Sequence, residues 1–161
     1  MPAVRIDPAV PADVPLILDL IRGLAEYEHE PLSATATAEQ LQDALFGERP
    51  AAECAIARID SGAVGFALWC QNFSTWTGRP GLWLEDLFVQ PEHRRCGAGR
   101  ALLRHLAHIC VERGYGRFEW SVLDWNQPSI GFYRSLGAVP MDGWTTFRLT
   151  GAALRNLARP E

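Results

Sequence analysis

The segment LEDLFVQPEHRRCGAGRALL, residues 84–103, carries the strongest structural signal in this chain. A carboxylate pair, Glu85-Asp86, interrupts an apolar run that predicts a strand over residues 82–89. A turn follows, and Arg94-Arg95-Cys96-Gly97-Ala98-Gly99 then opens an amphipathic helix. The first N–H groups of a helix have no partner within it and lie at the positive end of its dipole. The segment therefore predicts an anion-binding corner, suited to a phosphate or diphosphate, after an acidic strand.

Hydrophobic periodicity and turn residues place the other elements around this segment. Further strands are predicted at residues 4–6, 53–58, 64–70, 118–122 and 143–149, and helices at residues 14–30, 37–47, 97–113, 129–136 and 151–159. Asp13 and Thr37 are expected to cap the first two helices, and residues 72–81 to form a loop that contains Trp76. Interleaved helices and strands without repeats or linkers predict one α/β (α+β) domain over residues 1–161.

Composition narrows the class of protein. The net charge of −4 argues against a nucleic-acid binder, whose surface is usually basic. The cysteines stand singly, without the close pairs of a zinc site, and are expected to be free thiols. The first residues lack the basic start and apolar core of a signal peptide, and charges or glycines interrupt every apolar run. We therefore expect a cytoplasmic protein with no membrane partner.

Two motifs resemble the GCN5-related N-acetyltransferases (GNAT), a superfamily of acetyl-CoA-dependent enzymes. Arg94-x-x-Gly97-x-Gly99 is similar to its pyrophosphate-binding pattern, and residues 126–138, NQPSIGFYRSLGA, resemble its N-x-P-S/A-x-x-F-Y-x-x-x-G-A/F block. Residues 83–89, WLEDLFV, and 24–28, LAEYE, look like the spermidine/spermine, or diamine and thialysine, acetyltransferase subgroup. The resemblance covers nearly the whole chain and implies a mixed, mostly antiparallel sheet of about six to seven strands flanked by about four to five helices.

The resemblance implies acetyl-CoA as co-substrate, no metal, and direct acetyl transfer in a ternary complex. A primary amine with a pKa near about 10.4 must lose a proton before it can attack a thioester. Glu85 is the expected base, acting directly or through water, and Tyr133 the expected acid that protonates the departing sulfur. Asp86 is expected on the opposite face of the strand, in a structural role.

Residues expected to bind acetyl-CoA follow from the same resemblance. Backbone N–H groups around Leu87 and Val89 are expected to meet the oxyanion and the pantetheine arm. The full expected set is Leu87, Phe88, Val89, Arg94, Arg95, Cys96, Gly97, Ala98, Gly99, Arg100, Asn126, Ser129 and Tyr133. Arg95 stands where the subgroup usually has a glycine, so its side chain must point outward, towards phosphate.

The expected acceptor is a primary amine on a small cationic metabolite: a diamine, a polyamine, a lysine-like amino acid or thialysine. Tyr27, Glu28, Trp76 and Glu85 are the expected substrate contacts. Polyamine-specific members carry an acidic residue shortly before the tryptophan, whereas this chain has Phe73-Ser74-Thr75-Trp76, which favours smaller amines. The resemblance also implies a homodimer.

Several alternatives stay open. Glu85 could be a solvated strand-end residue, Tyr133 a core aromatic, and residues 26–30 a solvated helix end. His105 and His108 have metal-ligand spacing, yet no third ligand shares their helix face. The chain could also be an acyl-CoA sensor with little catalysis, or it could acetylate peptides.

Overall fold

The computed structural model describes residues 3–160 and contains two compact units, one ending at Leu123 and one beginning at Asp124. The first unit holds β1 (Val4–Pro8), α1 (Val14–Tyr27), α2 (Ala38–Phe46), β2 (Glu53–Ile59), β3 (Gly62–Ser74), β4 (Arg79–Val89), α3 (Ala98–Glu112) and β5 (Phe118–Trp120). The second unit holds α4 (Gln127–Ser135) and α5 (Gly151–Leu157). Among the described helices, none has both the length and the apolarity needed to cross a bilayer.

One mixed sheet organises the first unit. Its strand order is β1-β2-β3-β4-β5; every neighbouring pair is antiparallel except β4 and β5, which run parallel. The expected α/β class and mostly antiparallel sheet are confirmed. Five strands are present in the described chain, fewer than the six to seven expected.

The missing strand is the one predicted at residues 143–149, which adopt no regular secondary structure. Alternating apolar residues give a segment the capacity to pair, but a strand forms only where a partner edge is in register. The expected loop at residues 72–81 is also wrong, because β3 and β4 continue as a hairpin to Ser74 and Arg79. Gly78 supplies the left-handed φ of 63° that closes this turn.

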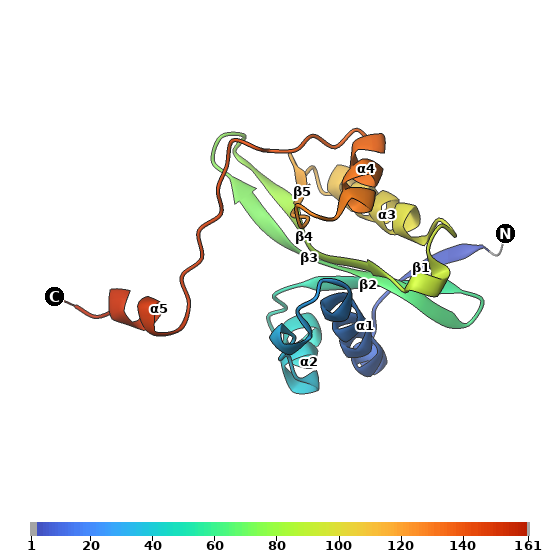
Figure 1. Cartoon of the computed structure of the whole chain (residues 1–161), viewed down its shortest axis with the longest axis horizontal. Helices are drawn as coiled ribbons and strands as arrows, with labels where there is room; N and C mark the ends of the chain where they lie inside the picture. Colours follow the sequence, from blue (N-terminus) through green and yellow to red (C-terminus); the bar gives the residue numbers. More distant parts are fainter. Residues whose placement is uncertain (1–2, 161) are drawn as a thin grey trace. The chain divides into compact units, whose positions relative to one another are not determined.

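Helices cover both faces of the sheet, with α1 and α2 on one side and α3 on the other (Figure 1). The α1–α2 side encloses a cluster of buried apolar residues: Val14, Ile17, Leu20, Leu41, Leu45, Cys54, Ile56, Phe66 and Phe88. On the other side α3 buries Leu102, Leu103 and Leu106, which recur at helical spacing. Each face of the central strands is thus sealed by a helix, leaving edges and strand ends for function.

Local capping explains where α2 begins, but the predicted cap of α1 is not formed. The Thr37 hydroxyl accepts from the Gln40 N–H at 3.2 Å, and the Gln40 side chain accepts from the Thr37 N–H at 2.9 Å, as the sequence predicted. The predicted cap at Asp13 is wrong: its carboxylate accepts instead from the Val10 N–H and from Arg58 on β2, at 3.0 and 2.7 Å. An ion pair between the start of α1 and strand β2 replaces the local cap.

Candidate active site

A β-bulge at Glu85 is the central feature of the candidate site. Across the β3–β4 pair, Trp69 lies opposite Leu84 and Leu68 opposite Asp86, so Glu85 has no partner on β3. A bulge of this kind inserts one residue, bends the strand and changes which way the following residues point. The carboxylate pair that interrupts the apolar run in the sequence is therefore the place where the strand changes phase.

Because of this phase change, a different set of peptide groups faces the β5 side of β4 after the bulge. Before the bulge, the Leu82 N–H donates towards β5, to the Arg117 carbonyl at 2.9 Å. After it, the Gln90 N–H donates to Val64 on β3 at 2.9 Å, so by alternation the peptide groups of Leu87 and Val89 face away from β3. Pairing with β5 ends at Leu84, and beyond that residue β3 is the only strand within residues 3–160 that pairs with β4. The predicted backbone groups therefore lie at an unpaired edge.

The bulge also brings the neighbouring carboxylates to one face. Asp86 lies opposite Leu68, which packs against the α1–α2 core, and the Trp83 indole N–H donates to the Glu85 carboxylate at 2.9 Å. Trp83 lies opposite Cys70, two residues from Leu68 and on the same face. The expectation that Asp86 points to the opposite face from Glu85 is wrong, because strict alternation does not hold across a bulge.

Among the carboxyl groups near the bulge, Asp86 has a strongly raised pKa. Burial, with the negative charges of Glu85 and Glu28 acting in the same direction, raises the pKa of Asp86 to about 6. Burial also raises the pKa of Glu28, the C-cap residue that follows α1. Three carboxyl groups from two elements therefore converge on the α1 side of the bulge, next to the open edge. Such a cluster favours a cation.

The predicted anion-binding corner follows β4. α3 begins at Ala98 with Gly97 as N-cap, and no side chain caps it. Its first internal hydrogen bond is donated by the Ala101 N–H to Gly97, so the preceding helical N–H groups have no acceptor within the helix. Arg94, Arg95 and Arg100 are exposed around this end. The corner therefore combines unpaired donors with positive charge.

Two residues of this corner have left-handed backbone conformations. Gly97 has φ 91° and Arg95 has φ 65°, a conformation in which a side chain other than glycine's is strained. A Cβ added at Gly97 would meet nothing within 4 Å, and one added at Gly99 would come no nearer than 3.9 Å to Val89. The glycines thus leave space above the helix start, which no part of the described chain fills.

The remaining predicted residues are placed as follows. Trp76 is 82% exposed at the tip of the β3–β4 hairpin. Strand β4 begins just after this tip, at Arg79, and about 20 Å of strand (six residues) separate Arg79 from Glu85. Within this unit, Trp76 is not brought to the bulge.

In the second unit, the buried Asn126 side chain caps α4 by accepting from the Ser129 N–H at 3.4 Å. Tyr133 lies on α4 with its ring against Phe132, the centroids being 5.6 Å apart.

Comparisons with known proteins decide the family. Residues 17–138, more than half of the chain, match the acetyltransferase (GNAT) family. A thialysine N-epsilon-acetyltransferase of Sus scrofa is 37% identical over 98% of this chain and 99% of its own length. The chain belongs to the GNAT acetyltransferase family. An L-ornithine N5-acetyltransferase of Arabidopsis thaliana is 29% identical over 94% of this chain and 86% of its own length. Among solved structures, an integron cassette protein from the V. cholerae mobile metagenome has the same fold, with a TM-score of 0.81, 24% identity and 98% coverage of both chains.

GNAT acetyltransferases use acetyl-CoA as co-substrate, and this acetyltransferase has the features that such a ligand needs. A diphosphate requires N–H donors and positive charge, which the start of α3 and the arginines beside it provide. A pantetheine arm requires free peptide groups, which the edge of β4 provides at Leu87 and at the N–H of Val89, whose carbonyl accepts from Arg94. The site residues present therefore fit the co-substrate.

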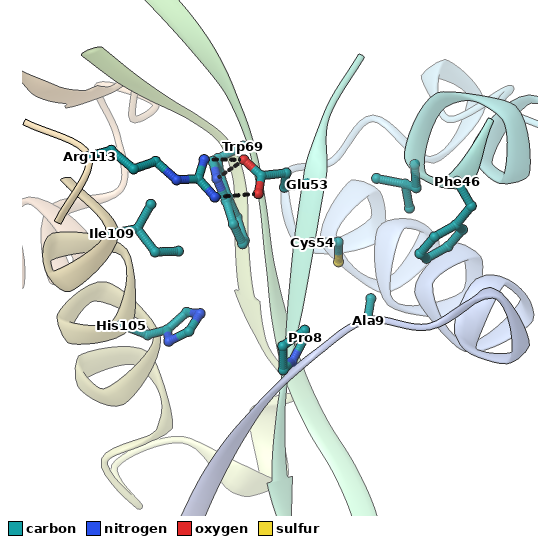
Figure 2. A pocket seen from close by; sticks show the side chains of 10 residues that line it. Pro8, Ala9, Phe46, Glu53, Cys54, Trp69, His105, Ile109 and Arg113 are labelled. Atoms are coloured by element: carbon teal, nitrogen blue, oxygen red, sulfur yellow. Dashed lines mark hydrogen bonds and ion pairs between the residues drawn. The ribbon is translucent and has the colours of Figure 1, made fainter. Parts of the chain in front are cut away.

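A separate pocket of about 300 Å³ lies in this acetyltransferase where β1 ends, and none of the predicted site residues lines it (Figure 2). Glu53 accepts from Arg113 through both carboxylate oxygens, at 2.6 and 2.7 Å, and from the Trp69 indole at 3.2 Å. These contacts, chiefly the Arg113 hydrogen bonds, lower the pKa of Glu53. The lining residues are Pro8, Ala9, Leu45, Phe46, Glu53, Cys54, Trp69, His105, Ile109 and Arg113. The ion pair on its wall joins β2 to the end of α3.

Within residues 3–160, no group of three or more His, Cys, Asp or Glu is arranged to hold a metal ion. His105 lies edge-on to Trp69, at 6.4 Å between ring centroids, so its neighbour is an aromatic ring. The cysteines are free, as expected, and burial raises the pKa of Cys54 to about 12. A thiol with so high a pKa is protonated near neutral pH and is a poor nucleophile.

Sequence reasoning missed two features of the site. The first is the bulge, which puts Asp86 on the same face as Glu85. The pair of adjacent charges inside an apolar strand could have indicated it, because a regular strand would place one charge on each of its faces. The second is the contact of Arg94 with Tyr27, whose ring centroid lies 4.3 Å from the guanidinium carbon. The sequence places these two residues far apart, and no local pattern links them.

Proposed function

We propose that this acetyltransferase transfers an acetyl group from acetyl-CoA to a primary amine of a small cationic metabolite. Lysine-like amino acids such as thialysine and ornithine are the first candidates, followed by diamines and polyamines. The relatives named for thialysine and ornithine acetylation support this substrate class, because they match nearly the whole chain. Transfer is direct, in a ternary complex of enzyme, acetyl-CoA and amine.

The observation that carries the proposal is the bulge in β4. Glu85 and Asp86 share the face on which Glu28, the C-cap residue of α1, lies, beside the unpaired edge of the strand. Negative charge on that face attracts a cationic amine and repels an anionic ligand. The unpaired peptide groups next to it provide hydrogen-bond donors for the acyl oxygen as it gains charge.

Proton transfer is assigned to two residues. A protonated amine is not a nucleophile, so Glu85, exposed at the bulge, takes the proton directly or through a water molecule. Tyr133 on α4 provides a proton to the departing sulfur. Acetyl-CoA itself supplies the activated thioester. Leu87, Phe88, Val89 and residues 94–100 hold it, together with Asn126, Ser129 and Tyr133, while Tyr27 and Glu28 contact the amine. The exposed Trp76, at the far end of the hairpin, is left out of this assignment.

These assignments require both units to act as one catalytic domain spanning residues 1–161. The family match supports this, because residues 17–138 cross the boundary at Leu123. We further propose a cytoplasmic homodimer with the amine pocket completed near the subunit interface, a state supported by the family resemblance. Size-exclusion chromatography with light scattering tests it, and the mass of one chain would contradict it.

The test of function is turnover with a panel of amines. The purified chain is incubated with acetyl-CoA and thialysine, lysine, ornithine, putrescine, spermidine or an aminoglycoside, and thiol release is followed together with the product mass. We expect the highest kcat/KM with a lysine-like amino acid. CoA binding without thiol release for any amine would contradict the enzyme and favour a sensor; turnover confined to peptides would contradict the substrate class.

Two variants test the assigned roles in the same assay. Tyr133→Phe is expected to lower kcat by about 10²–10⁴-fold with little change in acetyl-CoA affinity, since it removes only the proton donor. Glu85→Gln is expected to lower kcat and remove the acidic limb of its pH profile. An unchanged rate for Tyr133→Phe, or an unchanged acidic limb for Glu85→Gln, would remove that residue from its role.

A further inference from the structure

Arg94 is held between the ends of two elements of the first unit. Its guanidinium carbon lies 4.3 Å from the centroid of the Tyr27 ring, at the last residue of α1. Its Nε donates to the Val89 carbonyl at 3.2 Å, at the last residue of β4. The planar cation is thus stacked on one side and hydrogen-bonded on its edge, at the corner where β4 gives way to the α3 start.

The two terminal nitrogens of this guanidinium remain available. Within residues 3–160, these two nitrogens donate no hydrogen bond and form no ion pair, and Arg94 is exposed. A guanidinium presents five donors in a rigid fork that matches phosphate oxygens. With Nε already used by Val89, the remaining donors suit an anionic ligand at the α3 start.

Close packing of α1 on β4 allows Tyr27 to reach Arg94. A Cβ added at Gly23 would lie 3.0 Å from the Phe88 ring, so glycine at this position lets the helix approach the strand closely. Tyr27 follows Gly23 by one helical turn and lies on the same helix face. The ring is therefore brought to the end of β4 by helix–strand packing.

We propose that Tyr27 is a positioning residue for the diphosphate of the co-substrate: its ring holds the Arg94 guanidinium at the end of β4 with its terminal nitrogens free for phosphate. The inference rests on the proposed function. A flexible arginine loses side-chain freedom on binding an anion, and an arginine already stacked loses less. Tyr27 therefore affects CoA affinity through Arg94, from the helix whose end carries Glu28.

Calorimetric titration with CoA alone tests the proposal without turnover. Tyr27→Leu is expected to weaken CoA binding about three- to tenfold, because the cation–π contact is lost. Tyr27→Phe keeps the ring and is expected to keep the wild-type affinity. In the Arg94→Ala background, Tyr27→Leu is expected to have no further effect, since the residue through which it acts is gone.

Other outcomes overturn the inference. Unchanged CoA affinity in Tyr27→Leu, an equal loss in Tyr27→Phe, or the same loss with and without Arg94 would each do so. Arg94→Lys is a surface change that keeps the charge but loses the planar fork; it is expected to weaken CoA binding and to reduce the effect of Tyr27→Leu. Arg22→Ala, an α1 arginine paired with Asp19, is the control expected to retain CoA affinity. Absence of CoA binding by the wild type would instead overturn the proposed function itself.

Discussion

Asp86 shows how one extra residue in a strand changes the chemistry of its neighbours. The bulge at Glu85 turns Asp86 to the α1 side, where burial and the charges of Glu85 and Glu28 raise its pKa to about 6. Near neutral pH Asp86 is mostly ionised and adds negative charge to the proposed amine pocket. Below about pH 6 this charge is lost, and a cationic ligand loses part of its attraction.

Asp86→Asn tests the raised pKa through stability. The folded chain holds this proton more tightly than the unfolded chain, for which the pKa is near 3.8, so the contribution of Asp86 to stability falls as the pH rises from about 4 to about 6. Relative to wild type, the variant is therefore expected to gain about 1–3 kcal/mol between pH 4 and pH 7. Urea unfolding of both proteins at each pH measures the difference, and parallel pH profiles would contradict the assignment.

At the residue scale, the sequence identified the chemical groups better than their orientation. Thr37 and Gln40 form the predicted capping box because the interaction spans a single helical turn. Asp13 had an equally good local signal, yet Arg58 on β2 takes its carboxylate. A local capping preference of about a kcal/mol is readily outweighed by an ion pair that the tertiary fold brings within reach.

At the scale of elements, β3 and β4 approach each other closely beyond the bulge, where Gly65 lies opposite Val89. A Cβ on Gly65 would overlap the Phe88 carbonyl oxygen, and its next neighbour, the Val89 Cα, would be at 3.1 Å. Backbone atoms of a paired strand cannot move away as a side chain can. Glycine at this position therefore allows the two strands to pair where the open edge begins.

Gly65→Ala is expected to destabilise the chain by about 1–3 kcal/mol, because the added methyl group forces the two strands apart. The matched control is Gly143→Ala, where an added Cβ meets nothing within 4 Å, and it is expected to be nearly neutral. Thermal unfolding followed by circular dichroism compares them. Equal stability of both variants would mean that the β3–β4 pair adjusts without strain.

Element boundaries were predictable where they depend on nearby residues. The helix stop at Gly114 and the turn at residues 60–62 were placed correctly from glycine and turn chemistry. The lengths of β3 and β4 and the absence of a strand at residues 143–149 were not, since each depends on which edge pairs with which.

At the scale of the whole molecule, the proposed ligand should stabilise the fold. A ligand that binds only the folded state at about a hundred times its Kd adds about 2.7 kcal/mol. For a chain of this length we expect acetyl-CoA to raise Tm by about 5–10 °C, as measured by scanning calorimetry. Adenosine, which lacks the diphosphate, is the control and should shift Tm far less. No shift with acetyl-CoA would contradict binding at the α3 start.

The chain's own residues determined the start of α2, the glycine that precedes α3, the arginines around its start and the family, since each is encoded in short motifs or in matched stretches of sequence. Packing alone decided that Asp86 shares a face with Glu85, that Leu87 and Val89 lie on an open edge, and that Tyr27 stacks on Arg94. The physical reason is range: dihedral preferences and capping act over a few residues, whereas strand register and helix–sheet contact join residues distant in the chain.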